Sequence, residues 1–186
     1  MEQRISPCYD PFQFDVAVVN VDDLSSIETP LTDCIYHSKQ PEKLDLYVSG
    51  FEGIASTPTI LICFTAAVDS RPTKCGPFFS GLGLRNSLQI PLIAIADPLV
   101  SSKDLSIAWY AGSEDCIDLP QKLATFLDRI AEQYQAKLIL FGGSGGGFAT
   151  LALGHFLRSE ATLIASNPQT SISKYIYSFA HDYVVN

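Results

Sequence analysis

The chain has 186 residues, of which 47% are hydrophobic and only 17% are charged. This length suits one sizeable core, so we expect residues 1–186 to form a single domain, with some apolar surface covered by another subunit or by further chain. The net charge is −8, and no basic run stands out. Nucleic-acid binding therefore has no electrostatic support.

The sequence also argues against a membrane protein and against a disulfide framework. No window of about 18 apolar residues occurs, and the N-terminus lacks the apolar core of a signal peptide. The five cysteines form no C-x-x-C pair, and their number is odd. We therefore expect reduced thiols, no membrane span and a cytoplasmic location, with Cys63 as a small core residue.

The N-terminal half reads as a series of strands. Residues 14–21 predict a first strand, and residues 44–49 alternate apolar and polar side chains as in a half-buried antiparallel strand. Residues 59–64 and 90–96 are continuously apolar, which is typical of strands covered on both faces. The segment 68–86 is long and rich in glycine and proline, and loops of that length are more often functional than idle.

The next segments predict a strand over 105–111 and an amphipathic helix over 119–135. Leu123, Phe126 and Ile130 fall at helical spacing in that helix, and Pro120 suits its first turn.

The C-terminal part then predicts a strand over 137–141, a helix over 145–158, a strand over 162–165 and a last helix over 171–184. Strands that alternate with helices are typical of a parallel sheet with crossover connections. We therefore expect an α/β fold: a mostly parallel sheet with flanking helices, and antiparallel strands at the N-terminus.

Ser144 is the candidate nucleophile. It lies within Gly142-Gly143-Ser144-Gly145-Gly146, directly after an apolar strand and before a helix, the context that a nucleophile elbow requires. Glycines allow the strained turn and the close approach of strand and helix. The N–H of Gly145 would then point at a developing oxyanion. A phosphate-binding loop or a purely structural turn are the alternatives, although no Walker-type lysine follows.

A second oxyanion donor is expected from the loop after residues 59–64, where Thr65 and Ala66 stand. Small residues there would let a backbone N–H approach a substrate. An ordinary turn of small residues would explain the same pair.

The C-terminal half resembles α/β-hydrolase-like proteins associated with bacterial surface glycans, including accessory secretion proteins that act on serine-rich glycoproteins. The matching segments are Trp109-Tyr110-Ala111-Gly112, residues 141–149 and Ser166-Asn167-Pro168-Gln169-Thr170 with Tyr175, and Asp97-Pro98 also fits. The resemblance covers roughly residues 50–180 and implies O-acyl chemistry on a carbohydrate or glycoprotein.

The chain departs from that superfamily where the base should be. The expected order is nucleophile, acid and then histidine, on later strands, but only about forty residues follow Ser144. The domain would thus lack its last strands. His181 is the candidate general base, since it alone follows the elbow at a distance. His155 lies three turns along the next helix, and His37 would need an unusual loop return. For each, a surface or structural role is the alternative.

No residue stands out as the triad acid. Asn167 follows the strand 162–166 and cannot serve as a carboxylate, so it would cap the next segment or shape the pocket. Asp97, at the end of its strand, would line the site, or else form a turn before Pro98. No spacing of His, Cys and carboxylates suggests a metal site, and no cofactor is expected.

Two functions follow. The first is a serine-dependent acyl-ester hydrolase or acyltransferase, in which Ser144 attacks a small-molecule or glycan ester. The second is a catalytically incomplete scaffold that binds a glycan or a protein partner. In either case the unfinished sheet edge could pair with a second copy to give a homodimer.

Overall fold

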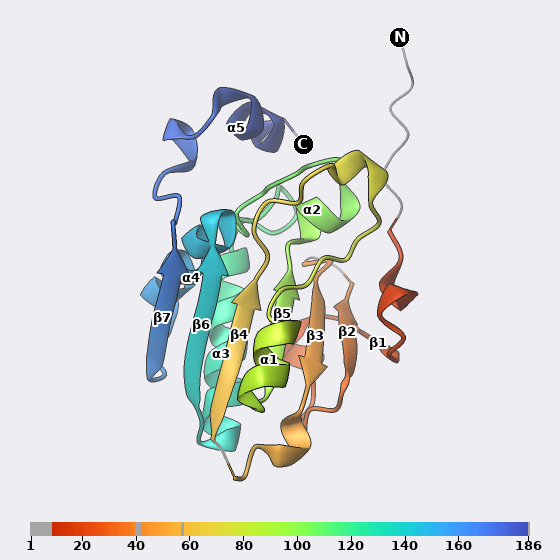
Figure 1. The fold of residues 1–186 in the computed structure, drawn as a ribbon, viewed down its shortest axis with the longest axis vertical. Helices are drawn as coiled ribbons and strands as arrows, with labels where there is room; N and C mark the ends of the chain where they lie inside the picture. Colours follow the sequence, from red (N-terminus) through yellow and green to blue (C-terminus); the bar gives the residue numbers. More distant parts are fainter. Residues whose placement is uncertain (1–8, 40–41, 57, 186) are drawn as a thin grey trace.

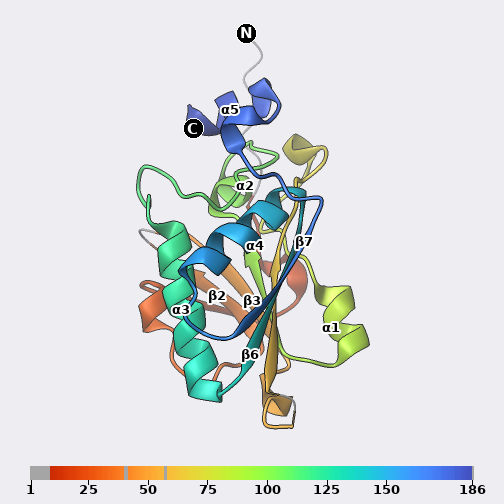
Figure 2. The same ribbon diagram turned by 90° about the vertical axis from the view of Figure 1, so that its left-hand side faces the viewer.

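The computed structural model describes residues 9–39, 42–56 and 58–185. The N-terminal start and Cys8, which carry the expectations of no signal peptide and of a reduced thiol, lie outside the described residues. Within these ranges the chain forms one seven-stranded sheet with helices on both faces. Figure 1 shows α1 in front of the sheet and α3 and α4 behind it, and Figure 2 shows the same layers edge-on.

The sheet order is β1-β2-β3-β5-β4-β6-β7. The strands are β1 (Val18–Val21), β2 (Cys34–Ser38), β3 (Asp45–Ser49), β4 (Thr59–Phe64), β5 (Leu92–Ala96), β6 (Lys137–Gly143) and β7 (Ala161–Ser166). Strand β3 runs antiparallel to β2 and β5, whereas the other neighbouring pairs are parallel. The expected α/β class, with a mostly parallel sheet and antiparallel strands at the N-terminus, is confirmed.

The α-helices are α1 (Leu82–Leu88), α2 (Pro98–Ser102), α3 (Leu119–Tyr134), α4 (Ser144–Phe156) and α5 (Tyr177–Val184). Short 3-10 turns occur at η1 (Pro11–Phe14), η2 (Leu24–Ser26), η3 (Phe51–Gly53), η4 (Arg71–Thr73) and η5 (Ile172–Lys174). The main core lies between the sheet and the pair α3 and α4, where Leu123, Leu127 and Ile130 are fully buried. These residues fall on one helix face, as the periodicity predicts.

The strand expected over 105–111 is wrong. This segment is an irregular buried loop, in which Trp109 and Tyr110 adopt left-handed backbone conformations with φ of 58° and 56°. The N–H of Tyr110 donates to the buried carboxylate of Asp97, 2.7 Å away, instead of to a neighbouring strand. The residues of this loop are apolar because the loop is buried, and their run of apolar side chains therefore resembled a strand.

The cysteines differ in part from expectation. Cys34, Cys63 and Cys116 are free and buried, but Cys75 is disulfide-bonded, so the expectation of reduced thiols is wrong for Cys75. The cysteine pattern therefore no longer supports the expected cytoplasmic location. Among the described residues, no helix combines the length and apolar character needed to cross a bilayer.

Candidate functional site

Ser144 lies at the junction of β6 and α4, in a left-handed conformation with φ of 51°. This conformation is strained for a residue with a side chain and costs of order 1–3 kcal/mol. The close approach of α4 to the sheet explains the surrounding glycines, because a Cβ at Gly146 would lie 2.6 Å from the carbonyl oxygen of Phe64. The backbone thus has the strand–turn–helix geometry of an elbow.

The Oγ of Ser144 accepts a hydrogen bond from Nε2 of Gln169, 2.8 Å away. The backbone N–H of Gln169 also donates to the Ser144 carbonyl, at 3.3 Å. Gln169 follows β7, so the chain returns from this strand across the start of α4. The segment after the last described strand therefore lies directly over the elbow.

Trp109 fixes the orientation of the Gln169 amide. Its indole Nε1–H, which can only donate, binds Oε1 of Gln169. The NH₂ group must therefore face Ser144. The Trp109 side chain is buried, and its ring makes edge-on contacts with Tyr175 and Tyr183, whose centroids lie 5.8 and 5.6 Å away. An amide held in this way can donate to Ser144 but cannot accept its proton.

His181 lies on α5 with its side chain 51% exposed, and its Nδ1 is 3.8 Å from the Asp182 carboxylate. Among the described residues, no hydrogen bond joins His181 to Ser144. His155 is exposed in the last turn of α4. The structure therefore does not bring either histidine to the candidate nucleophile, and the role of His181 as a base stays a prediction.

His37 lies on β2, which three strands separate from β6. Four strand spacings amount to roughly 19 Å, so its ring cannot reach Ser144. Its Nδ1 instead lies 2.9 Å from the fully buried carboxylate of Asp45, which also accepts a hydrogen bond from the Tyr9 hydroxyl. The hydrogen bond between His37 and Asp45 raises the pKa of His37.

The backbone N–H of Thr65 already has an acceptor. It donates to the Tyr110 hydroxyl at 2.7 Å, and that hydroxyl donates to the Ile95 carbonyl at 2.8 Å. Burial raises the pKa of Tyr110, which keeps the hydroxyl protonated as this donor. Thr65 therefore could act as an oxyanion donor only after Tyr110 had moved.

Ala66 and Gly145 line a cavity of about 10 Å³, together with Ile107 and Trp109. A cavity of this size is at the lower limit for a single water molecule. The Gly145 N–H is in the first turn of α4, where backbone donors have no partner within the helix. The space beside it therefore does not admit an ester substrate in this conformation.

Asp97 lines the same small cavity, but its carboxylate is a structural cap. It accepts from the backbone N–H groups of Leu99 and Val100 at the start of α2, as well as from Tyr110. Burial raises the pKa of Asp97 to about 6. Asn167 is exposed at the end of β7, with φ of 45°. Within the described residues its side chain makes no hydrogen bond, so it forms the turn rather than a cap.

Sequence reasoning did not assign roles to Gln169 or Trp109, although both lie in the segments that carry the resemblance. Their signal was only their presence in those segments, because sixty residues separate them in the chain. Among the described residues, no group of three or more His, Cys, Asp or Glu could hold a metal ion.

Neither the known protein families nor the curated proteins contain a match to this chain. A solved structure, the Glycosylation Associate Protein (Gap123) complex from Streptococcus agalactiae, is similar with a TM-score of 0.44 and 19% identity. The match covers 63% of this chain and 20% of that one. The chain thus spans about a fifth of the protein that it matches.

Proposed function

We propose that this chain is a catalytically incomplete α/β-hydrolase-like scaffold that binds a protein partner. The observation that carries this proposal is the hydrogen bond from Gln169 to Ser144. A serine nucleophile needs an adjacent group that accepts its proton. The group beside Oγ is a neutral amide, and the indole of Trp109 prevents it from presenting its oxygen.

The packing around the elbow supports the same proposal. Tyr183 contacts the Trp109 ring and donates its hydroxyl to the Gly112 carbonyl at 3.0 Å. The chain that follows Gln169 is thus held by two contacts of Tyr183, one to Trp109 and one to Gly112. Together with the cavity of only about 10 Å³ beside Gly145, this leaves no room for a substrate.

The partner surface that we propose is the outer edge of β7. In the described residues this strand pairs only with β6, and it lies at the margin of the sheet in Figure 1. Leu163 and Ile164 are 40% and 46% exposed, and the neighbouring Leu151 on α4 is 42% exposed. An open, apolar edge strand is a template for pairing with another chain.

A second copy of this chain is the occupant that we propose for the edge. The strand β7 consists of Ala161, Thr162, Leu163, Ile164, Ala165 and Ser166 and carries no charged side chain. Two antiparallel copies related by a two-fold axis would therefore place no like charges opposite each other.

Two measurements test the scaffold proposal. A fluorophosphonate probe should label the wild-type protein no more strongly than the Ser144→Ala variant. Light scattering of the wild-type protein at micromolar concentration should give a dimer. The variant Ile164→Asp should be monomeric, whereas Val19→Asp, at an exposed position of β1 on the opposite edge, should remain dimeric. Labelling of Ser144 would contradict the incomplete site, and a monomeric wild-type chain would contradict the edge contact.

A second candidate is the serine-dependent acyl hydrolase or acyltransferase. The strained φ of Ser144 supports it, because such strain tends to persist where a function requires it. In this case Gln169 would have to leave Oγ, and a base would have to reach it. Cleavage of p-nitrophenyl acetate that is lost in Ser144→Ala would favour this candidate, and equal rates in both proteins would remove it.

A further inference from the structure

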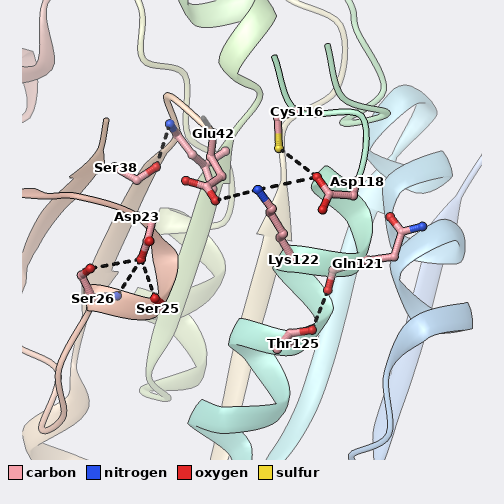
Figure 3. Close-up of polar contacts among 11 residues, drawn as sticks. Asp23, Ser25, Ser26, Ser38, Glu42, Cys116, Asp118, Gln121, Lys122 and Thr125 are labelled. Atoms are coloured by element: carbon pink, nitrogen blue, oxygen red, sulfur yellow. Dashed lines mark hydrogen bonds and ion pairs between the residues drawn. The ribbon is translucent and has the colours of Figure 1, made fainter. Parts of the chain in front are cut away.

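A cavity of about 460 Å³ lies between η2 and the first turns of α3 (Figure 3). Leu24 and Phe126 supply apolar parts of its wall, and Ser25, Gln121 and Thr125 supply polar groups. This volume is in the range that holds small molecules. Ser144 is not among its lining residues, so the cavity is separate from the elbow.

Glu42 is the group in this cavity whose hydrogen-bonding capacity is unfilled. Its side chain is only 3% exposed, and its Oε2 has no hydrogen-bond partner among the described residues. Lys122 Nζ is 3.5 Å from Oε1. Buried carboxylates normally accept hydrogen bonds, because the loss of water is otherwise costly. Lys122 therefore serves Oε1, whereas Oε2 of Glu42 lacks a donor within the described part of the chain.

Lys122 is shared between two carboxylates. Its Nζ is also 3.6 Å from Oδ1 of Asp118, so it lies between Glu42 and Asp118 at about the same distance from each (Figure 3). Both distances exceed those of normal hydrogen bonds. One ammonium group therefore does not fill the acceptors of the two carboxylates.

The remaining charges leave the cavity negative. Asp23 accepts hydrogen bonds from Ser25 and Ser26, which lower its pKa and keep it ionised. The other cation in the wall, Arg129, donates to the carbonyls of Leu24 and Ile27. Two of its five N–H donors are therefore committed to backbone carbonyls in and directly after η2. Three carboxylates, Asp23, Glu42 and Asp118, thus face two cations, which leaves one negative charge in excess.

We infer that this cavity binds a small organic cation, in which a primary ammonium group is carried on a short apolar body. The ammonium donates to Glu42 and Asp118 beside Lys122, and its charge neutralises the excess negative charge of the cavity. The apolar body lies against Leu24 and Phe126.

The test is a titration with n-butylammonium, followed by the backbone amide resonances of the wild-type protein. n-Butanol and butyrate serve as neutral and anionic counterparts of the same chain length. We expect saturable shifts confined to residues 23–26, 42–44 and 118–126 with n-butylammonium alone. Equal shifts with n-butanol would overturn the requirement for charge, and the absence of any saturable shift would overturn the site.

Glu42→Gln removes the charge while keeping the shape, and we expect its Kd for n-butylammonium to rise at least tenfold. Asp22→Asn is the matched control, because Asp22 is 84% exposed and does not line the cavity. Its Kd should equal that of the wild type. Asp118→Asn, at an exposed position, should raise the Kd at least threefold and decides the question if Glu42→Gln does not fold. Unchanged affinity in both cavity variants would overturn the proposal.

Discussion

Gln169 and Ser144 are joined twice, once through the amide Nε2 and the Ser144 Oγ at 2.8 Å and once through their backbones at 3.3 Å. The first contact takes the place at which a triad would hold an imidazole. The second ties the segment after β7 to the first residue of α4. The same residue pair therefore sets both the chemistry of the serine and the path of the chain above it.

Replacing Gln169 with Leu should lower the free energy of unfolding by about 1–3 kcal/mol, because it leaves the buried indole N–H of Trp109 without an acceptor. Urea denaturation, followed by the fluorescence of this single tryptophan, measures the change. Gln133→Leu, which alters an exposed amide on α3, should have little effect. Equal stability of both variants would show that the Trp109–Gln169 contact contributes nothing.

Gly146→Ala should destabilise the protein by about 1–3 kcal/mol or more, because the added Cβ would lie 2.6 Å from a backbone oxygen that cannot rotate away. Gly83→Ala is the matched control on α1. A Cβ there has no atom within 4 Å and should stabilise the helix by up to about 1 kcal/mol. Thermal unfolding of the two variants checks the pair. A Gly146→Ala protein as stable as the wild type would contradict the close approach of α4 to β4.

The free energy of unfolding should fall as the pH rises from about 4 to about 6, because Asp97 ionises over this range. Burial raises its pKa from 3.8 to about 6 in the folded protein, so the unfolded chain releases this proton at lower pH than the folded one. Above pH 6 the full loss, about 3 kcal/mol, has been reached.

The measurement for Asp97 is the free energy of unfolding in urea between pH 4 and pH 7. In Asp97→Asn the decline between pH 4 and pH 6 should be smaller than in the wild type, because no carboxyl group titrates at this position. Parallel curves for the two proteins would show that burial does not disfavour the ionised form of Asp97.

His37 should contribute stability with the opposite dependence on pH. Its folded pKa lies above the ordinary value of 6.5 because of Asp45, so the contribution is complete below pH 6.5 and is lost as the pH rises through the folded pKa. His37→Gln should therefore cost about 2 kcal/mol at pH 6 and less at pH 8.5, as measured by urea denaturation. His155→Gln, at an exposed position, should show no such difference.

The sequence alone predicted the strands and helices in which the spacing of apolar residues shows which side chains are buried. Residues 59–64 match β4, and the helix expected over 119–135 matches α3, because an apolar face repeats every three or four residues there. The glycine-rich turn also placed Ser144 between a strand and a helix. By contrast, β2 and the short helices α1 and α2 were not predicted, since none has a long periodic pattern.

The contacts that decide the candidate site depended on the tertiary structure. Trp109, Ser144 and Gln169 come from a loop, an elbow and the end of a strand, and no spacing in the chain indicates that they meet. The sequence determined the fold class because apolar residues recur at the spacing of a helix or run together as in a buried strand, and this spacing distinguishes the two kinds of element. Only the three-dimensional packing decided that an amide, rather than a histidine, lies beside Ser144, because hydrogen-bond partners are selected by proximity in space.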